Sequence, residues 1–126
     1  MKSVAIIAVI IALIWILNGY TSQYIGNSSK ELLGYVDEAK KAVKAEDMYN
    51  TNVQIGMLRA EWETAESHWE ALVDHREIDR IDTLMTHLEA MAGTGALDDM
   101  LPELEELAFF LTHIDDKHKI WAENIF

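Results

Sequence analysis

The sequence lacks cysteine and has a single proline among its 126 residues. The absence of cysteine excludes disulfide bonds and a cysteine nucleophile, and it fits either an extracytoplasmic or a cytoplasmic location. One proline and six glycines leave few points at which a helix has to break. Because no stretch alternates apolar and polar residues in the manner of a strand, the sequence predicts an all-α protein.

Basic residues are also scarce. Ten lysines and arginines stand against 22 acidic residues, which gives a net charge of −12, and no base occurs between Arg80 and Lys117. Nucleic-acid binding requires clustered basic side chains that displace counterions, so no nucleic acid is expected as a partner. The simplest interpretation is that the acids solvate the outer faces of helices. The alternative is an acidic surface for divalent cations or for a basic partner.

Charge is missing from the N-terminal segment as well. Residues 4–17 are all apolar, Lys2 precedes them, and the next charged residue is Lys30. Such a run is close to the lower limit of about 17 to 25 residues for a helix that crosses a bilayer. We therefore predict a transmembrane anchor and juxtamembrane segment in residues 1–27, whose anchoring residues include Val4, Ile7, Ile11, Ile14 and Trp15.

Two alternatives exist for this run. A cleaved signal peptide has the same layout, although no small-residue cleavage site follows Leu17. A buried core helix is the second alternative. If the run is an anchor, its orientation follows from charge, because lysine and arginine flank membrane spans on the cytoplasmic side. Lys2 and the α-amino group therefore predict a single-pass protein with a cytoplasmic N-terminus and an extracytoplasmic C-terminal domain.

Residues 28–126 are expected to form one domain, an antiparallel bundle of about four helices. A capping-box pattern, Ser28-x-x-Glu31, predicts the start of the first helix. Asp47 and Asp74 are predicted to cap the second and third helices. The helices are expected over about 29–45 and 47–73, from a turn at 74–76 to about 92, and onward to about 114.

The end of the chain contains the main difficulty for this assignment. Pro102 is tolerated in a first turn, so the fourth helix either begins near Leu101 or is kinked there. The helix is expected to end before Asp115-Asp116. A short final segment is then expected to fold back on the bundle through its apolar residues, Ile120, Trp121, Ile125 and Phe126.

Apolar residues repeat three and four apart along the predicted second helix, from Ile55 to Leu72. This heptad seam has to be buried against another helix, either within one chain or between protomers. Gly56, on the same helix, is interpreted as a close helix contact. The predicted core contains Trp62, Trp69, Ile78, Ile81, Leu104 and Leu111.

The densest polar cluster covers residues 74–82 and reads Asp-His-Arg-Glu-Ile-Asp-Arg-Ile-Asp. Imidazole nitrogens and carboxylate oxygens are ligands for divalent cations, and a carboxylate can orient an imidazole for proton transfer. The alternative interpretation is structural, because acids are favoured in the first turn of a helix. The candidate metal ligands are His75, Glu77, Asp79 and Asp82.

Motifs of the common catalytic and metal sites are missing. The sequence has no Glu-x-x-His pair, no His-Glu-x-x-His, no Gly-x-Ser-x-Gly elbow and no phosphate-binding glycine loop. We therefore expect no enzymatic activity, and no cofactor other than a divalent cation at the polar cluster.

Several short stretches resemble a known family. These are Trp62 and Trp69, Asp74-His75-x-Glu77-Ile78-Asp79-x-Ile81, Glu106-Leu107, His113-Ile114 and Asn124-Ile125-Phe126. Over about residues 28–126 the sequence resembles the bacterial family called domain of unknown function 4363. The resemblance implies a small Gram-positive protein with an N-terminal membrane segment and a helical remainder, and it implies no activity. Pro102 departs from the helix-forming residue that this resemblance leads us to expect.

The expected function is a non-enzymatic interaction or scaffold module at the outer face of a bacterial cytoplasmic membrane. The N-terminal helix would contact membrane lipid. An apolar seam left open on the bundle would bind a protein partner or a second copy of the chain. The alternative is an extracytoplasmic metal- or ligand-sensing domain centred on Asp74-His75-x-Glu77-x-Asp79.

Overall fold

The computed structural model describes the backbone of residues 1–125 and the side chains of residues 1–120. Four α-helices and a short 3-10 helix make up this part of the chain: α1 (Lys2–Lys44), α2 (Met48–Trp69), α3 (His75–Thr94), η1 (Leu97–Asp99) and α4 (Met100–Ile125). No strand occurs among residues 1–125. The predicted all-α class with four main helices is confirmed.

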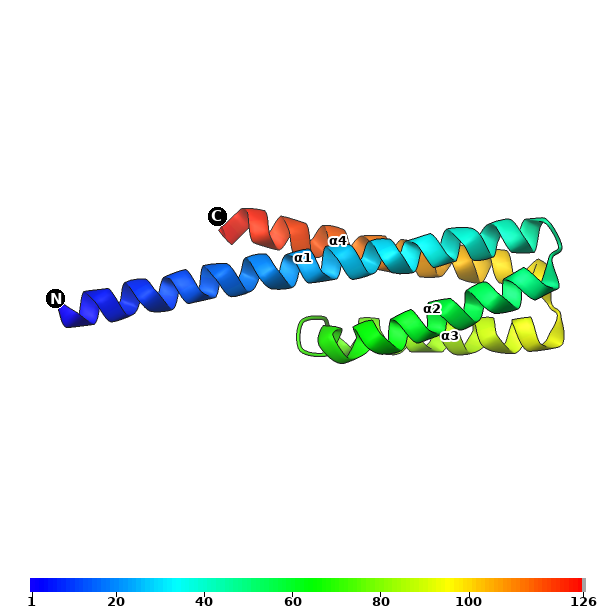
Figure 1. Ribbon diagram of the computed structural model, residues 1–126, viewed down its shortest axis with the longest axis horizontal. Helices are drawn as coiled ribbons and strands as arrows, with labels where there is room; N and C mark the ends of the chain where they lie inside the picture. The colour runs from blue at the N-terminus through cyan, green and yellow to red at the C-terminus, as the bar shows by residue number, and fades with distance from the viewer. Residues whose placement is uncertain (126) are drawn as a thin grey trace.

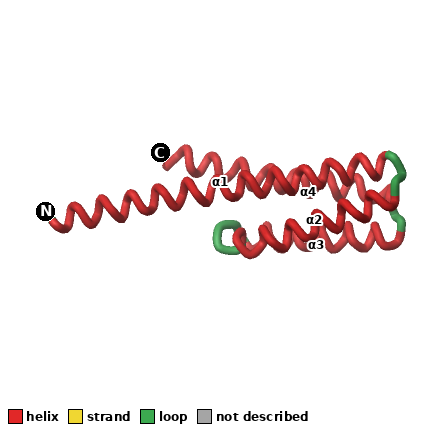
Figure 2. Tube along the Cα trace, viewed as in Figure 1, coloured by secondary structure: helices red, strands yellow, loops and turns green. Residues whose placement is uncertain are grey.

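The helices form an elongated antiparallel bundle (Figure 1). α1 contacts α2 and α4, and α3 contacts the same two helices, so each main helix borders two others around a common core. The N-terminal half of α1 extends beyond the α2–α3 hairpin, which ends well short of the N-terminus (Figure 2). A compact bundle is thus continuous with a long projecting helix.

α1 is a single unbroken helix of 43 residues, so the predicted helix start at Ser28 is wrong. The Ser28 hydroxyl donates to the carbonyl oxygens of Tyr24, at 2.8 Å, and Ile25, at 3.2 Å, as a serine inside a helix does. The physical reason is packing. Ile25 is fully buried on the same face as Leu32 and Val36, so the buried stripe continues through the capping-box pattern. The boundary placed between residues 27 and 28 therefore falls inside a helix and inside the core.

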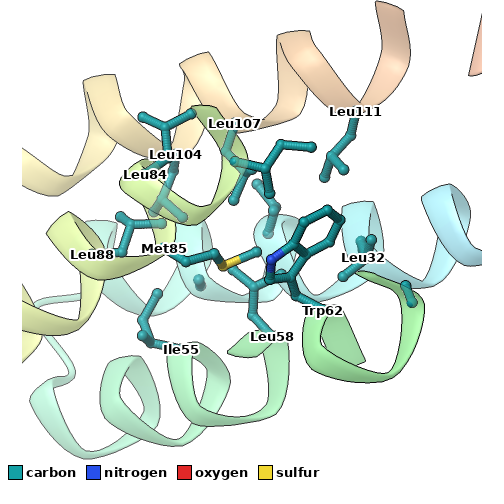
Figure 3. Close-up of a cluster of buried hydrophobic side chains, with 14 of the residues drawn as sticks. Leu32, Ile55, Leu58, Trp62, Leu84, Met85, Leu88, Leu104, Leu107 and Leu111 are labelled. Atoms are coloured by element: carbon teal, nitrogen blue, oxygen red, sulfur yellow. The ribbon is translucent and has the colours of Figure 1, made fainter. Parts of the chain in front are cut away.

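The predicted core residues are all buried, and side chains from all four helices meet in that core. Trp62 and Trp69 contact each other edge to face, with ring centroids 5.5 Å apart and planes at 89°. Figure 3 shows Trp62 and Met85 surrounded by leucines of the neighbouring helices. Gly56 is not a close helix contact as predicted, because nothing lies within 4 Å of a methyl group built on it.

The predicted caps of α2 and α3 are confirmed. Asp47 Oδ1 accepts from the backbone N–H of Asn50 at 3.0 Å, and Asp74 Oδ1 accepts from that of Arg76 at 2.8 Å. Gly95 ends α3 in the left-handed conformation, with φ of 75°. These turns explain why the chain reverses where it does.

α4 begins at Met100, which places Pro102 in its first turn and agrees with the first of the two predicted possibilities. The predicted helix end before Asp115 is wrong, because α4 continues to Ile125. Asp115 is buried, with 8% exposure, and pairs with Lys119 one turn later at 2.9 Å. It is therefore an interior residue of α4 and does not end the helix. Ile120 is 57% exposed and does not fold back on the bundle. The side chains of Trp121, Ile125 and Phe126 lie outside the described residues.

One helix among the described residues, α1, is long and apolar enough to cross a membrane. Its most apolar 18-residue window has a mean hydropathy of 2.3, and no residue of that window is buried. The predicted anchoring residues belong to this exposed stretch: Val4, Ile7, Ile11, Ile14 and Trp15. The buried-core alternative for this run does not agree with its exposure.

Candidate functional site

The four candidate metal ligands do not share a site. Among the described residues, no three histidine, aspartate or glutamate side chains gather in a way that holds a metal ion. His75 and Asp79 are exposed on α3. Glu77 instead faces Lys117 of α4 at 3.7 Å, and Asp82 faces α2. The polar cluster of the sequence is therefore divided between different sides of one helix.

Asp82 has a structural partner that the sequence pattern did not indicate. Its Oδ1 accepts a 2.7 Å hydrogen bond from the indole Nε1 of Trp62, which is fully buried. The guanidinium of Arg59 lies 3.9 Å from the same oxygen. A buried indole N–H requires an acceptor, so Asp82 satisfies the core tryptophan and is engaged in fold stability.

Glu66 joins Trp62, Arg59 and Asp82 in a polar seam between α2 and α3. Burial raises the pKa of Glu66 to about 7, and a hydrogen bond to Asp82 together with the negative charges of Asp82 and Glu70 acts in the same direction. Arg59 opposes the shift. The raised pKa of Glu66 therefore arises from its place between the two helices, beside the carboxylate of Asp82.

A second carboxyl pair lies between α1 and α2. Burial raises the pKa of Glu61, and a hydrogen bond to Glu31 and the charge of Glu31 add to the shift. The exposed Arg80–Glu106 pair, by contrast, joins α3 to α4. These interhelical polar contacts thus connect neighbouring helices to one another.

A pocket with a volume of about 320 Å³ lies at the end of the bundle from which the apolar run projects. Asn18 and Thr21 of α1, the turn between α2 and α3, and the end of α4 line it. Glu77 and Lys117 face each other there, and burial together with Lys117 lowers the pKa of His118. Lys117 and His118 were not among the predicted site residues, since they are about 40 residues away from the cluster.

A shallow groove runs between α1 and α2 and has a volume of about 530 Å³. Gly34 and Tyr35 form its α1 side, Met57 lies on its α2 side, and Glu31 and Glu38 belong to the lining. Met57 continues an exposed apolar stripe on α2 that also includes Tyr49, 79% exposed, and Val53, 37% exposed. Three apolar residues four apart define one helix face, so this second face was detectable in the sequence. The sequence analysis identified only the heptad seam from Ile55 to Leu72 on the opposite face of α2.

Comparison with known proteins gives the family. The model of a domain of unknown function, DUF4363, matches residues 19–125. The chain belongs to this family. No curated protein and no solved structure matches the chain.

The DUF4363 match covers the bundle and leaves the apolar run outside. It begins at Gly19 and includes α1 from Gly19 to Lys44 and the other three main helices. The groove and the polar seam both lie within the matched part. The family resemblance inferred from the sequence is confirmed, whereas the membrane segment rests on the composition and exposure of residues 4–17.

Proposed function

We propose that this DUF4363 protein is a non-enzymatic interaction module, anchored by α1 in a bacterial cytoplasmic membrane with its bundle on the outer face. The observation that supports the proposal most is the continuity of α1. One unbroken helix contributes both the exposed apolar run and the buried stripe from Ile25 to Val43. No flexible linker separates the two, so the bundle would be held at a fixed height and angle above the membrane.

The proposed orientation rests on charge. Lys2 is the only charged side chain before the apolar run, and none follows it until Lys30. If Lys2 is retained on the cytoplasmic side, α2, α3 and α4 lie outside the cell. The proposal includes no nucleic-acid partner, because the domain beyond residue 45 is strongly acidic.

The groove between α1 and α2 is the proposed binding surface, and its proposed occupant is an amphipathic helix that carries basic residues. The apolar contact would come from Met57 and Tyr35, which line the groove. Two acids and no base occur among the described residues that line the groove. The net charge of −12 opposes pairing of two copies and favours a basic partner.

The anchor and its orientation can be tested with cysteine labelling, because the natural chain has no cysteine. The full-length Glu46→Cys variant places a thiol at the exposed turn between α1 and α2. Intact cells should react with a membrane-impermeant maleimide at this position. Labelling only after the membrane is permeabilised would indicate the opposite orientation. Recovery of the chain in the soluble fraction after washing would contradict the proposed anchor.

The groove can be tested with a photo-crosslinking amino acid at Met57 in the full chain, in its native membrane. Phe109, 65% exposed on α4, gives the matched control position. The proposal requires one crosslinked protein at Met57 and none at Phe109, with the crosslink mapped to a basic amphipathic segment. A crosslink only to a second copy, or equal products at both positions, would overturn it.

A blocking variant makes this test specific. A methyl group built on Gly34 meets nothing within 4 Å, and Gly34 lines the groove, so Gly34→Trp is expected to fill the groove. The crosslink at Met57 should be lost in that background. The same replacement at Gly93, which also has open space but lies on α3, should leave the crosslink unchanged.

A further inference from the structure

We infer that the C-terminal end of α4, from Ile120 to Ile125, is a second membrane-contacting element that lies against the bilayer beside α1. This inference rests on the proposed anchoring of α1. It begins with an unexpected feature of the fold, the continuation of α4 past Asp115-Asp116. Figure 1 shows this end of α4 passing the α2–α3 turn and pointing toward the N-terminal end of α1.

The register between the antiparallel helices α1 and α4 shows which residues of α1 lie level with the C-terminal end of α4. A methyl group built on Gly26 would lie 3.4 Å from Oδ1 of Asp115, so these two residues are level. Four residues further along α4, and so about one helical turn nearer the N-terminal end of α1, Lys119 lines a shallow pocket whose α1 side runs from Gly19 to Lys30. The residues after Lys119 therefore lie level with α1 residues that precede Ser22.

The depth of α1 in a bilayer follows from its length. A hydrocarbon core of about 30 Å takes about 20 residues of helix, whereas the apolar run has 14 residues and spans roughly 21 Å. A short span is accommodated by thinning the bilayer or by drawing its flanks toward the lipid. The uncharged residues between Leu17 and Ser22 are then brought to the lipid boundary, and the end of α4 lies at this level.

The composition of α4 changes at the same point. Lys117 and Lys119 are the last basic residues of the sequence, and they pair with Glu77 at 3.7 Å and Asp115 at 2.9 Å. Glu123 is the only charged residue in the sequence beyond them. Ile120 directly follows Lys119 and is 57% exposed, although it is large and apolar. Basic side chains followed by apolar ones are the arrangement of a helix end at a lipid interface. A lipid bilayer explains the exposure of Ile120, which the bundle leaves uncovered.

The experiment uses single cysteines in the full chain, reconstituted in phosphatidylcholine vesicles and labelled with an environment-sensitive fluorophore. Ile120→Cys tests the inference. Thr112→Cys is the control on the same helix, two turns farther from the lipid, where the residue is exposed. Val9→Cys, in the middle of the apolar run, reports whether α1 is in the bilayer. Emission and quenching by iodide in the water and by a brominated lipid are measured at each position.

The inference requires labels at Val9 and Ile120 that are quenched by brominated lipid and protected from iodide several-fold relative to Thr112. If Val9 is protected while Ile120 is quenched by iodide as strongly as Thr112, the inference is overturned and the anchor stands. If Val9 is itself open to iodide, the proposed anchor fails and the inference fails with it. Neutral lipid is chosen so that attraction of Lys117 and Lys119 to anionic headgroups cannot produce the result.

Discussion

The indole Nε1 of Trp62 donates a 2.7 Å hydrogen bond to Oδ1 of Asp82, and this contact ties the middle of α2 to the middle of α3. Trp62 is fully buried, so its N–H has no access to water if the acceptor is removed. A carboxylate that appears in the sequence as a metal-ligand candidate therefore serves the core. The contact also places Asp82 beside Glu66. Because the pKa of Glu66 is raised in the folded state, the stability of the α2–α3 hairpin depends on the protonation of Glu66.

Replacement of Asp82 is predicted to destabilise the bundle. Asp82→Ala leaves the Trp62 N–H without a partner and should lower the free energy of unfolding by about 1–3 kcal/mol. Asp82→Asn retains an acceptor oxygen and should cost less. The matched control is Asp79→Ala, an exposed acid on the same helix, with an expected change within about 0.5 kcal/mol. Urea unfolding of the full chain in detergent micelles measures the difference. Equal effects at the two positions would argue against a structural role for Asp82.

The raised pKa of Glu66 predicts that stability falls as the pH rises. The folded state binds the Glu66 proton more tightly than the unfolded chain, so the stabilising contribution is full below the ordinary pKa of 4.5 and is lost as the pH passes about 7. Burial is the main cause, and Glu61 acts in the same direction. Thermal midpoints measured over this pH range should therefore decline toward neutral pH and above.

The variant that isolates this effect is Glu66→Gln, which keeps a hydrogen-bond donor to Asp82 and cannot ionise. It should flatten the decline and be more stable than the natural protein above pH 7. Glu70→Gln, on the exposed surface of the same turn, should leave most of the pH dependence in place. A Glu66→Gln protein with an unchanged pH profile would mean that the titrating group lies elsewhere.

The seams were predictable from the sequence because they depend on spacing alone. Apolar residues three and four apart identify the buried face of a helix, and for this reason Trp62, Ile78 and Leu111 were assigned to the core correctly. Caps at Asp47 and Asp74 depend on a local side-chain-to-backbone contact and were equally accessible.

The errors have a common physical cause, which is that a local signal was outweighed by packing from distant parts of the chain. The pattern Ser28-x-x-Glu31 is a good cap in isolation, but α2 packs against the preceding turn of α1 and keeps it helical. In the same way Asp115 looks like a helix end until its burial against α1 is seen. The partner of Asp82 is 20 residues away, beyond the reach of any spacing rule.

Replacement of Ser28 and of Ser29, two neighbouring residues of α1, is predicted to have opposite effects on stability. The Ser28 hydroxyl accepts a 2.8 Å hydrogen bond from Nε1 of Trp69, whereas the buried Ser29 hydroxyl has no hydrogen-bond partner among the described residues. Ser28→Ala should lower the free energy of unfolding by about 1–3 kcal/mol, because it leaves a buried indole N–H unpaired. Ser29→Ala removes an unsatisfied polar group and should be neutral or stabilising. Loss of stability at Ser29 equal to that at Ser28 would contradict the assignment of these contacts.

The glycines of the bundle are predicted to separate into two classes by backbone conformation. Gly34 and Gly56 lie inside α1 and α2 with open space around them, so alanine at either position should stabilise the protein by about 0.5–1 kcal/mol. Gly95 has a φ of 75° at the end of α3, and alanine there should destabilise it by about 1–2 kcal/mol. Thermal unfolding of the three variants by circular dichroism provides the comparison. If Gly56→Ala is destabilising, Gly56 makes a close helix contact after all. If Gly95→Ala is neutral, the turn after α3 adopts another conformation.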